Sequence, residues 1–371
     1  MKIVSVIGAR PQFIKCAPVS RQIRKDHQEI LIHTGQHYDP EMSDIFFKEL
    51  AIPAPDYHLG VGSATHGKQT GEILEKVEEI LLKESPALVL VYGDTNSTLA
   101  GALAAAKLHI PVVHVEAGLR SFDRAMPEEI NRILTDHISD ILFCSTQTAV
   151  DNLAREGISR GVYLTGDVMV DALLYNLEIA EQKSRILKRF HLKKKNYVVM
   201  TVHRPSNTDN AENMKNILQA AGKITENVVF PVHPRTRSFL VNYGLWHQMA
   251  GNIIITEPLG YLDMLHLMHH ADRILTDSGG IQKEAYLLKV PCITLRENTE
   301  WVETLEGGWN VLTGATKRKI TAAARRSRMT LPEQLYSFGD GHAAERMLEV
   351  IVRSQRMQNP EKDDASTPDA S

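Results

Sequence analysis

Ile274-Leu275-Thr276-Asp277-Ser278-Gly279-Gly280-Ile281-Gln282-Lys283-Glu284 reads as the end of a strand, a glycine turn and the first turn of a helix. This order is typical of a phosphate site, because backbone N–H groups and the positive end of the helix meet an anion there. Glu284 could accept hydrogen bonds from the hydroxyls of a ribose. An ordinary βα turn explains the stretch equally well, since short glycine motifs are weak signals.

The chain has 371 residues, so two domains of ~150–200 residues are expected. A net charge of -3 argues against nucleic acid as a partner, and no apolar run approaches the ~20 residues of a membrane span. The N-terminus resembles a first strand rather than a signal peptide. Three widely spaced cysteines, Cys16, Cys144 and Cys292, argue against a disulfide framework and fit a reducing cytoplasm.

Short apolar runs alternate with helical patterns along the whole chain. Runs that are apolar on both faces and separated by helices predict parallel sheets between layers of helices, hence an α/β protein with two doubly wound, Rossmann-like domains. The expected strands of the first half are residues 3–7, 30–33, 88–91, 112–115, 141–144 and 162–165. Those of the second half are residues 198–201, 228–232, 253–256, 273–276, 292–295 and 310–312.

The boundary between the domains is expected near Gly166-Asp167-Val168, where a long charged helix begins. The first domain is then 1–167 and the second 168–340, facing each other across a central cleft at the carboxyl ends of both sheets. A last helix, 341–354, is expected to pack back on the first domain. The polar tail 355–371 is expected to be disordered.

Polar residues follow most of the predicted strands. Arg10 and Lys15 follow the first, where two cations suit a diphosphate, although a solvated loop and a helix surface are the simpler explanation. Asp94 ends the third strand and could alternatively cap a helix. His203 and Arg204 follow the first strand of the second half and would face the cleft.

Glu116 lies in a buried strand, a costly place for a carboxylate without a function or a partner. A salt bridge to Arg120 or Arg132 is the structural alternative. Glu128 and Glu129 follow Pro127 in the first turn of a helix, and Glu129 at least is expected to be a surface acid matched to the helix dipole. The expected buried stripe of this helix consists of Ile130, Ile133, Leu134, His137 and Ile138.

No spacing of cysteine and histidine residues resembles a zinc site. His33 and His37 lack a third ligand within reach, and a polar loop explains them better. His269 and His270 fit a helix core and surface better than a metal site. The sequence therefore predicts no bound metal.

A set of motifs runs in order along residues 2–350. These are Gly8-x-Arg10-Pro11-x-x-x-Lys15, Gly93-Asp94-Thr95, Glu116-Ala117-Gly118-Leu119-Arg120, Pro127-Glu128-Glu129-x-Asn131-Arg132, His203-Arg204, Asp277-Ser278-Gly279-Gly280-x-Gln282-x-Glu284 and Gly339-Asp340-Gly341. In this combination the chain resembles the non-hydrolysing UDP-N-acetylglucosamine 2-epimerases. The resemblance implies a glycosyltransferase-B type fold and a cytoplasmic homodimer that serves polysaccharide biosynthesis.

The implied reaction inverts C2 of UDP-GlcNAc to give UDP-ManNAc. UDP is eliminated to leave bound 2-acetamidoglucal and is then added back, without a redox cofactor or a metal. By the same resemblance, the catalytic residues are Asp94, Glu116, Glu128 and His203. The residues expected to bind UDP are Arg10, Lys15, Arg204, Ser278, Gly279, Gly280 and Glu284.

The chain departs from the family pattern at a few positions. The usual Glu-Arg-Pro-Glu is Glu300-Trp301-Val302-Glu303, the usual Gln-Glu-Glu is Gln282-Lys283-Glu284, and the usual Gly-Asn-Thr is Gly166-Asp167-Val168. These variants resemble the branch that acts on UDP-2,3-diacetamido-2,3-dideoxyglucuronate. A glycosyltransferase of the same fold and a nucleotide-sugar binding protein without catalysis are the more distant alternatives.

Overall fold

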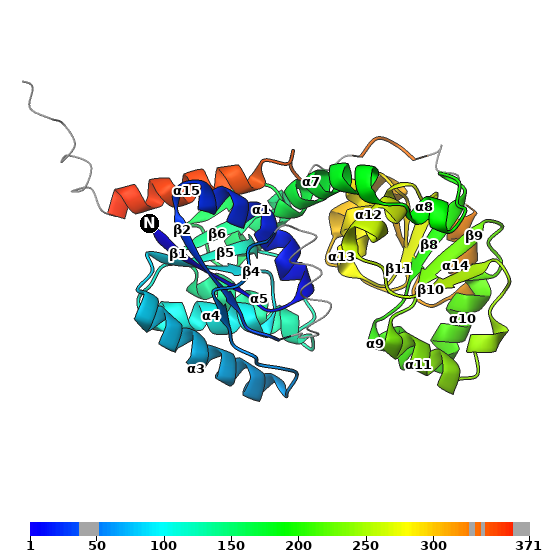
Figure 1. Ribbon diagram of the computed structural model, residues 1–371, viewed down its shortest axis with the longest axis horizontal. Helices are drawn as coiled ribbons and strands as arrows, with labels where there is room; N and C mark the ends of the chain where they lie inside the picture. The colour runs from blue at the N-terminus through cyan, green and yellow to red at the C-terminus, as the bar shows by residue number, and fades with distance from the viewer. Residues whose placement is uncertain (37–51, 326–330, 335–337, 359–371) are drawn as a thin grey trace, which may run out of the picture. The chain divides into compact units, whose positions relative to one another are not determined.

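The computed structural model describes residues 1–36, 52–325, 331–334 and 338–358 (Figure 1). It divides into two compact units. Unit 1 is Met1–Ala172 together with the chain from Gly339 onward, and unit 2 is Leu173–Phe338. The boundary expected after residue 167 lies just before this division, which falls inside the helix α7.

Unit 1 contains a parallel sheet of seven strands in the order β3-β2-β1-β4-β5-β6-β7. Successive strands build outward from β1 in one direction and from β4 in the other. In such doubly wound sheets, ligands bind at the carboxyl ends of the two strands where this reversal occurs. The strands are β1 Lys2–Ile7, β2 Gln28–His33, β3 Tyr57–His58, β4 Leu88–Tyr92, β5 Val112–Ala117, β6 Ile141–Cys144 and β7 Val162–Leu164.

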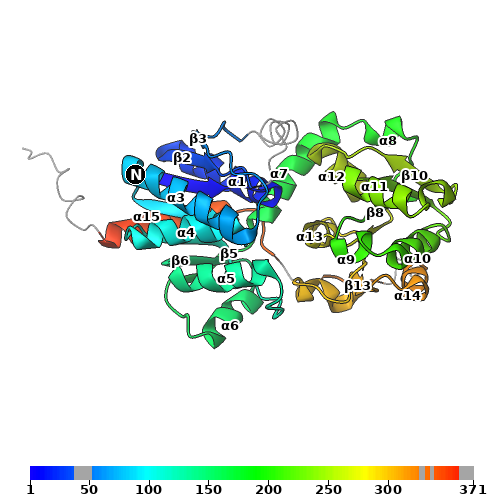
Figure 2. The same ribbon diagram turned by 90° about the horizontal axis from the view of Figure 1, so that it is seen from below.

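Helices cover both faces of this sheet. They are α1 Arg10–Asp26, α3 His66–Glu84, α4 Asn96–Lys107, α5 Pro127–Ile138, α6 Gln147–Arg155, α7 Val168–Lys183, whose later part belongs to unit 2, and α15 Ala343–Gln358. The last helix, α15, packs against α1, where Gln22 Nε2 donates to Glu345 Oε1 at 3.3 Å. Figure 2 shows α3, α4 and α5 side by side on the opposite face, and contacts join each to the next.

The sequence of each covering helix explains its packing. In α3, Ile73, Val77, Ile80 and Leu81 recur at helical spacing and form its buried side, as expected of an amphipathic helix. The helix α4 is rich in alanine and contains Gly101, whose absent side chain lets the helix approach Val6 of β1 closely. Small residues here bring the start of α4, which follows Asp94, close to the sheet.

Unit 2 repeats this architecture with a parallel sheet of six strands in the order β10-β9-β8-β11-β12-β13. The strand order again reverses next to the first strand, between β8 and β11. The strands are β8 Tyr197–Thr201, β9 Asn227–Pro231, β10 Ile253–Thr256, β11 Arg273–Thr276, β12 Cys292–Thr294 and β13 Asn310–Leu312.

The helices of unit 2 are α8 Ile186–Arg189, α9 Pro205–Thr208, α10 Ala211–Ala221, α11 Pro234–Asn242, η1 Trp246–Gln248, α12 Tyr261–His269, α13 Gly279–Leu287, η2 Val302–Gly308 and α14 Lys317–Ala324. Residues of α10, α11 and α14 share one apolar core with β8 and β9. Figure 1 shows α12 and α13 on the other face of the sheet.

The expected fold class is confirmed, and each expected strand is present with its ends shifted by at most a few residues. The strand β3 was not predicted, because two residues carry no recognisable period. The helix expected at 341–354 runs Ala343–Gln358, so its end extends into the expected tail, and residues 359–371 lie outside the described part of the chain. No described helix has the length and hydropathy of a membrane span.

Two glycines near β7 provide a test of close backbone packing. Both have left-handed backbone, with φ +69° at Gly161 and φ +82° at Gly157. A Cβ at Gly161 would overlap the carbonyl oxygen of Asp140, whereas a Cβ at Gly157 would meet no atom within 4 Å. We expect Gly157→Ala to lower the free energy of unfolding by about 1–2 kcal/mol, and Gly161→Ala by a further ~1–3 kcal/mol.

Urea unfolding of both variants, followed by circular dichroism, measures the difference. Equal midpoints for the two variants would show that the close approach of Gly161 to Asp140 adds nothing to the cost of a side chain at position 161.

Candidate active site

The turn after β1 is held by a side chain from within the helix that follows. Gln12 Oε1 accepts hydrogen bonds from the backbone N–H groups of Gly8 and Ala9, at 2.8 and 3.0 Å. Gln12 Nε2 donates to the carbonyl oxygen of Tyr92 at the end of β4, at 2.8 Å. The start of α1 is thereby fixed to the carboxyl end of β4. Arg10 is the first residue of α1, and its side chain lies outside what the structure describes.

Lys15, in the second turn of α1, forms an ion pair and a hydrogen bond with Glu116. Both side chains are almost entirely buried, with exposures of 11% and 7%. Burial by itself lowers the pKa of Lys15, but the charge of Glu116, followed by that of Asp94, outweighs it and the pKa lies above its ordinary value. Gly93 leaves room for this pair, since a Cβ there would lie 3.2 Å from Lys15 Nζ.

Glu116 occupies a strained position at the end of β5. Its φ is +73°, in the left-handed region that residues with a side chain rarely adopt. The pairing of β5 with β6 also shifts register between Val115 and Ala117, so Glu116 is the extra residue of a β-bulge. Strain of this kind persists where the surroundings enforce it and is frequent at functional sites.

Asp94 lies directly after Gly93 at the carboxyl end of β4. Its carboxylate accepts a hydrogen bond from Arg132 Nη2 at 2.6 Å, and its carbonyl oxygen accepts one from Asn131 Nδ2 at 3.0 Å. Arg132 Nη1 also donates to Glu129 Oε2 at 2.8 Å. Burial disfavours the charge of Arg132, but Asp94 and Glu129 outweigh this effect and raise its pKa. Two residues of α5, Asn131 and Arg132, therefore hold Asp94 in place.

Glu129 was expected on the surface and is instead 1% exposed. It accepts hydrogen bonds from the backbone N–H groups of Ser121 and Phe122, both at 2.9 Å, in addition to that from Arg132. Burial raises its pKa, but these hydrogen bonds outweigh burial and leave the pKa below its ordinary value. Glu129 is thus a structural acid that holds the loop after β5.

The expected buried stripe of α5 was also wrong. The buried residues of this helix are Glu129, Asn131, Arg132, Thr135 and Asp136, whereas Leu134 is 46% exposed. The polar face turns inward because it supplies partners to buried charges and backbone groups. Glu128 is half-buried in the first turn, and within the described residues it forms no hydrogen bond or ion pair.

Asp136 is the centre of a buried network behind these acids. Its carboxylate contacts His114 Nδ1 at 2.7 Å, Arg120 Nη1 at 2.7 Å and the N–H of Gly118 at 3.1 Å. His114 Nε2 lies 2.7 Å from the carbonyl oxygen of Gly93, to which it must donate. Burial raises the pKa of Asp136, but His114 and then Arg120 outweigh it, so the pKa lies below its ordinary value.

The salt bridges from Glu116 to Arg120 or Arg132 that the sequence allowed are not formed. Arg120 pairs with Asp136 and, through two hydrogen bonds of 2.7 Å, with Glu156. Arg132 pairs with Asp94 and Glu129. Among the described residues, Lys15 forms an ion pair with Glu116, as described above.

In unit 2, the buried carboxylate of Asp277 organises the carboxyl ends of β8 and β11. It accepts hydrogen bonds from the backbone N–H groups of His203 and Arg204, at 3.0 Å each, and from Asn207 Nδ2 at 3.0 Å. The side chain of His203 is 47% exposed, and its Nδ1 lies 3.5 Å from Asp277 Oδ1. His203 is thus held by its backbone while much of its ring faces solvent.

The turn at Ser278, Gly279 and Gly280 forms the N-terminus of α13. Ser278 is the N-cap, and its Oγ accepts from the N–H of Ile281 at 3.5 Å. No described residue accepts a hydrogen bond from the N–H of Gly279 or Gly280, as is usual for the first turn of a helix. A Cβ at Gly279 would overlap the Glu300 carboxylate, so Glu300 would have to move to admit a side chain there. Glu284 follows in the same helix and is buried, with 6% exposure.

Two residues that depart from the family pattern are in contact. Lys283 Nζ lies 4.0 Å from the ring centroid of Trp301, a cation–π contact, and 5.9 Å from that of Phe338. Lys283 is 1% exposed and Trp301 is 5% exposed. The two positions that depart from the family pattern are therefore neighbours in the structure.

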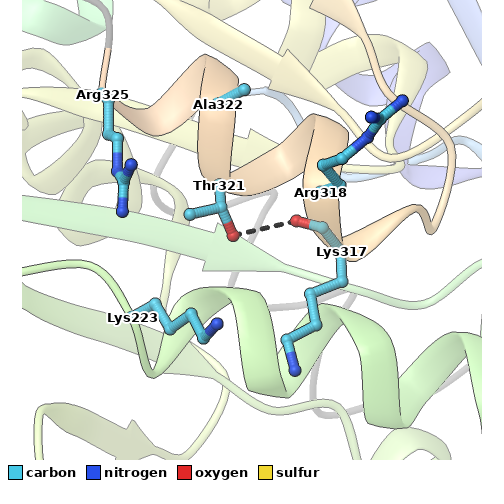
Figure 3. A pocket seen from close by; sticks show the side chains of 6 residues that line it. All are labelled: Lys223, Lys317, Arg318, Thr321, Ala322 and Arg325. Carbon is cyan, nitrogen blue, oxygen red and sulfur yellow. Dashed lines mark hydrogen bonds between the residues drawn. The ribbon is translucent and has the colours of Figure 1, made fainter.

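A cavity of about 440 Å³ lies elsewhere in unit 2, beside α14 (Figure 3). It is lined by Lys223, Lys317, Arg318, Thr321, Ala322 and Arg325. Figure 3 shows Thr321 Oγ1 donating to the carbonyl oxygen of Lys317, at 2.9 Å. None of the predicted site residues lines this cavity, so it is not the predicted UDP site.

The structure thus brings Lys15, Glu116 and Asp94 together in unit 1, and His203, Arg204 and Ser278 together in unit 2. Sequence reasoning gave no role to Asp136 or His114, which hold the first group, or to Asp277, which holds the second. An acid after an apolar strand was the available signal for Asp277. Nothing in the sequence signals the network of Asp136, because its members come from different elements.

Comparisons with known proteins agree with this architecture. A family model described as UDP-N-acetylglucosamine 2-epimerase matches residues 21–352. A protein of Methanococcus maripaludis named UDP-N-acetylglucosamine 2-epimerase homolog is 57% identical over 354 residues, which cover 95% of this chain and 99% of that protein. A UDP-2,3-diacetamido-2,3-dideoxy-D-glucuronate 2-epimerase of Pseudomonas aeruginosa is 46% identical over 362 residues, which cover 95% and 100%.

The crystal structure of Methanocaldococcus jannaschii UDP-GlcNAc 2-epimerase in complex with UDP-GlcNAc and UDP superposes with a TM-score of 0.86. Its sequence identity is 46%, and the match covers 95% of this chain and 100% of that chain. The resemblance expected from the sequence motifs is confirmed: this chain belongs to the UDP-N-acetylglucosamine 2-epimerase family.

Proposed function

We propose that this protein is a non-hydrolysing UDP-N-acetylglucosamine 2-epimerase, an isomerase that interconverts UDP-GlcNAc and UDP-ManNAc. Beside the family match, the observation that carries the proposal is Glu116. It is a buried carboxylate in left-handed backbone near the carboxyl end of β5, against the ammonium of Lys15. Such a costly arrangement is explained by a reaction that needs an acid at this place.

The reaction requires a base, a leaving group and a second proton transfer. A base removes the proton from C2, the C1–O bond breaks, and UDP leaves with the bonding electrons to give 2-acetamidoglucal. UDP then returns to C1 while a proton reaches C2 on the opposite face. C2–H is only weakly acidic, so the elimination depends on neutralising the charge that develops on the diphosphate.

We assign the proton transfers to the carboxylates Asp94, Glu116 and Glu128 in unit 1, with His203 in unit 2 as a further catalytic group. Asp94 and Glu116 are anchored by cations, and Glu128 forms no hydrogen bond or ion pair within the described part of the chain. Lys15 contacts Glu116, so a diphosphate bound to Lys15 would add negative charge beside this acid.

We assign UDP binding to Arg10, Lys15, Arg204, Ser278, Gly279, Gly280 and Glu284. The N–H groups of Gly279 and Gly280 lie at the positive end of α13 and are suited to a phosphate oxygen. The reaction leaves the oxidation state of the sugar unchanged, so we expect no redox cofactor, and we expect no metal in it. The three cysteines are buried and free, which agrees with the proposed cytoplasmic location, and we assign the protein to polysaccharide biosynthesis from its family.

A second candidate substrate is UDP-2,3-diacetamido-2,3-dideoxy-D-glucuronate, which would react by the same elimination. The contact between Lys283 and Trp301 supports this candidate, because the family pattern has Glu at the position of Lys283 and Arg at the position of Trp301. The change adds one positive charge, which an extra carboxylate on the sugar would balance. We prefer UDP-GlcNAc because the Lys283 ammonium already contacts the ring of Trp301 and is buried.

We also propose that the protein forms a homodimer. The apolar face of α5 is turned outward, with Leu134 46% exposed and Ile130 and Ile133 half-buried on the same side. Exposed apolar faces of this kind are typical of surfaces that associate.

Solvent exchange tests the reaction. Substrate turned over in D₂O should gain deuterium at C2, and Asp94→Asn or Glu116→Gln should slow this by more than about 100-fold, since each removes a group that transfers or positions a proton. Mass spectrometry of the sugar measures the label. Glu79→Gln, which alters an exposed acid of α3, is the matched control and should retain activity.

Release of UDP only when an acceptor is present, without label at C2, would instead identify a glycosyltransferase. Full turnover in a variant lacking Asp94, Glu116 and Glu128 would contradict the assignment of these acids.

The substrate can be decided by comparing the turnover of both UDP-sugars. We expect UDP-GlcNAc to be preferred. The paired variant Lys283→Glu/Trp301→Arg should keep that preference, because an ion pair between the two new side chains takes the place of the cation–π contact. A change in preference of tenfold or more, equivalent to about 1.4 kcal/mol, would show that the pair selects the sugar. Lys283→Glu alone should be less stable than the pair, because it places a carboxylate against the ring of Trp301.

The dimer can be tested at Leu134. We expect Leu134→Lys to yield a monomer in size-exclusion chromatography with light scattering, because a charge would be buried at the interface. Leu164→Lys is the control, since Leu164 of β7 is 53% exposed in the same unit but not on α5. A Leu134→Lys protein that remains a dimer would place the interface elsewhere.

A further inference from the structure

A cluster of histidines and one acid in unit 2 takes no part in the proposed reaction. His266, His269 and His270 lie at the end of α12, and Glu181 lies in the last turns of α7. Glu181 Oε1 is 2.7 Å from His270 Nε2 and 3.8 Å from each of His266 Nδ1 and His269 Nε2. The donor atoms of Glu181, His266 and His270 all lie within 4.8 Å of one another.

The two imidazoles at the centre of this cluster are buried, and in each of them one ring nitrogen has no hydrogen-bond partner in the described part of the chain. His266 and His270 are 7% and 6% exposed. Within the described residues, neither His266 Nδ1 nor His270 Nε2 has a hydrogen-bond partner. The contact of His270 Nε2 with Glu181 Oε1, at 2.7 Å, is an ion-pair distance. Buried polar atoms are rarely left in this state unless an ion or water completes them.

The spacing of these groups suits a tetrahedral metal ion. Residues four apart on a helix lie on the same face, as His266 and His270 do. Metal–nitrogen and metal–oxygen bonds of about 2.1 Å separate tetrahedral ligand atoms by roughly 3.4 Å. The donor separations of 2.7 and 3.8 Å bracket this value, so only small side-chain movements are needed.

The cluster is open to solvent on one side, because Glu181 is 37% exposed and gives an ion access to the buried imidazoles.

The two helices that carry the ligands are also fixed to their surroundings. Ser184 Oγ, just after α7, donates to Asp263 Oδ1 of α12 at 2.6 Å. Lys195 Nζ donates to the carbonyl oxygen of Ala271, just beyond α12, at 3.0 Å.

We propose that Glu181, His266 and His270 bind a divalent transition-metal ion, zinc, at a structural site that joins α7 to α12. His269, whose Nε2 lies 3.8 Å from Glu181 Oε1, is close enough to approach the ion as a fourth ligand or to be replaced by water. Imidazole and carboxylate ligands suit zinc, whereas magnesium and calcium require oxygen ligands. The sequence pattern favoured a helix core and surface for His269 and His270, because Glu181 comes from a helix far away in the chain.

The test uses the full chain without an affinity tag, stripped with a chelator and titrated with Zn²⁺ or Co²⁺ near pH 7.5. We expect about one tightly bound ion per chain, visible d–d bands of tetrahedral Co²⁺, a higher Tm with Zn²⁺, and no binding of Mg²⁺. His266→Ala and His270→Ala should each weaken binding by roughly 100-fold or more, since changes to outer groups alone cost about 10–100-fold.

Glu181→Gln alters a partly exposed side chain and should weaken binding without disturbing the fold, which circular dichroism of the metal-free protein checks. His247→Ala is the control, because His247 is an exposed histidine of the same unit. Absence of stoichiometric binding to the unaltered chain would overturn the proposal. Binding that survives in His266→Ala/His270→Ala would also overturn it, since it would then come from other histidines.

Discussion

The carboxylate of Asp136 is the interaction on which the acids of unit 1 depend. It has no exposure to solvent, and it accepts from His114, Arg120 and the backbone of Gly118. His114 in turn donates to the carbonyl oxygen of Gly93, the residue before Asp94. One buried acid thereby joins α5 to the ends of β4 and β5. A buried charge persists only when every partner is in place, so the network fixes the backbone on either side of Asp94 and Glu116.

Asp277 has the same function in unit 2. It is fully buried at the end of β11 and accepts from the backbone at the end of β8, where His203 and Arg204 lie. Both units therefore place a buried carboxylate at the carboxyl ends of their strands, where backbone N–H groups have no ladder partner. The acid satisfies these groups and leaves the neighbouring side chains at the sheet edge for a ligand.

The sequence predicted the fold well because strands of a buried parallel sheet are short, continuous apolar runs, and only the two-residue β3 was missed. It also located Asp94, Glu116 and the turn after Thr276 at strand ends. It could not predict the bulge at Glu116, since backbone torsion depends on pairing with β6. Nor could it predict that Glu129 is buried, because a carboxylate in the first turn of a helix has the same local pattern whether it faces water or the N–H groups of a neighbouring loop.

The error at α5 has one physical cause with two consequences. Periodicity assigns the apolar side of a helix to the core, but hydrogen bonds to buried charges can outweigh that preference. In α5 they do, because Arg132 and Asp136 are required beside Asp94 and His114. Once the polar side faces inward, Leu134 must face outward. The arrangement that holds the acids therefore also creates an apolar surface, and covering that surface with a second copy of the chain would recover the free energy that its exposure costs.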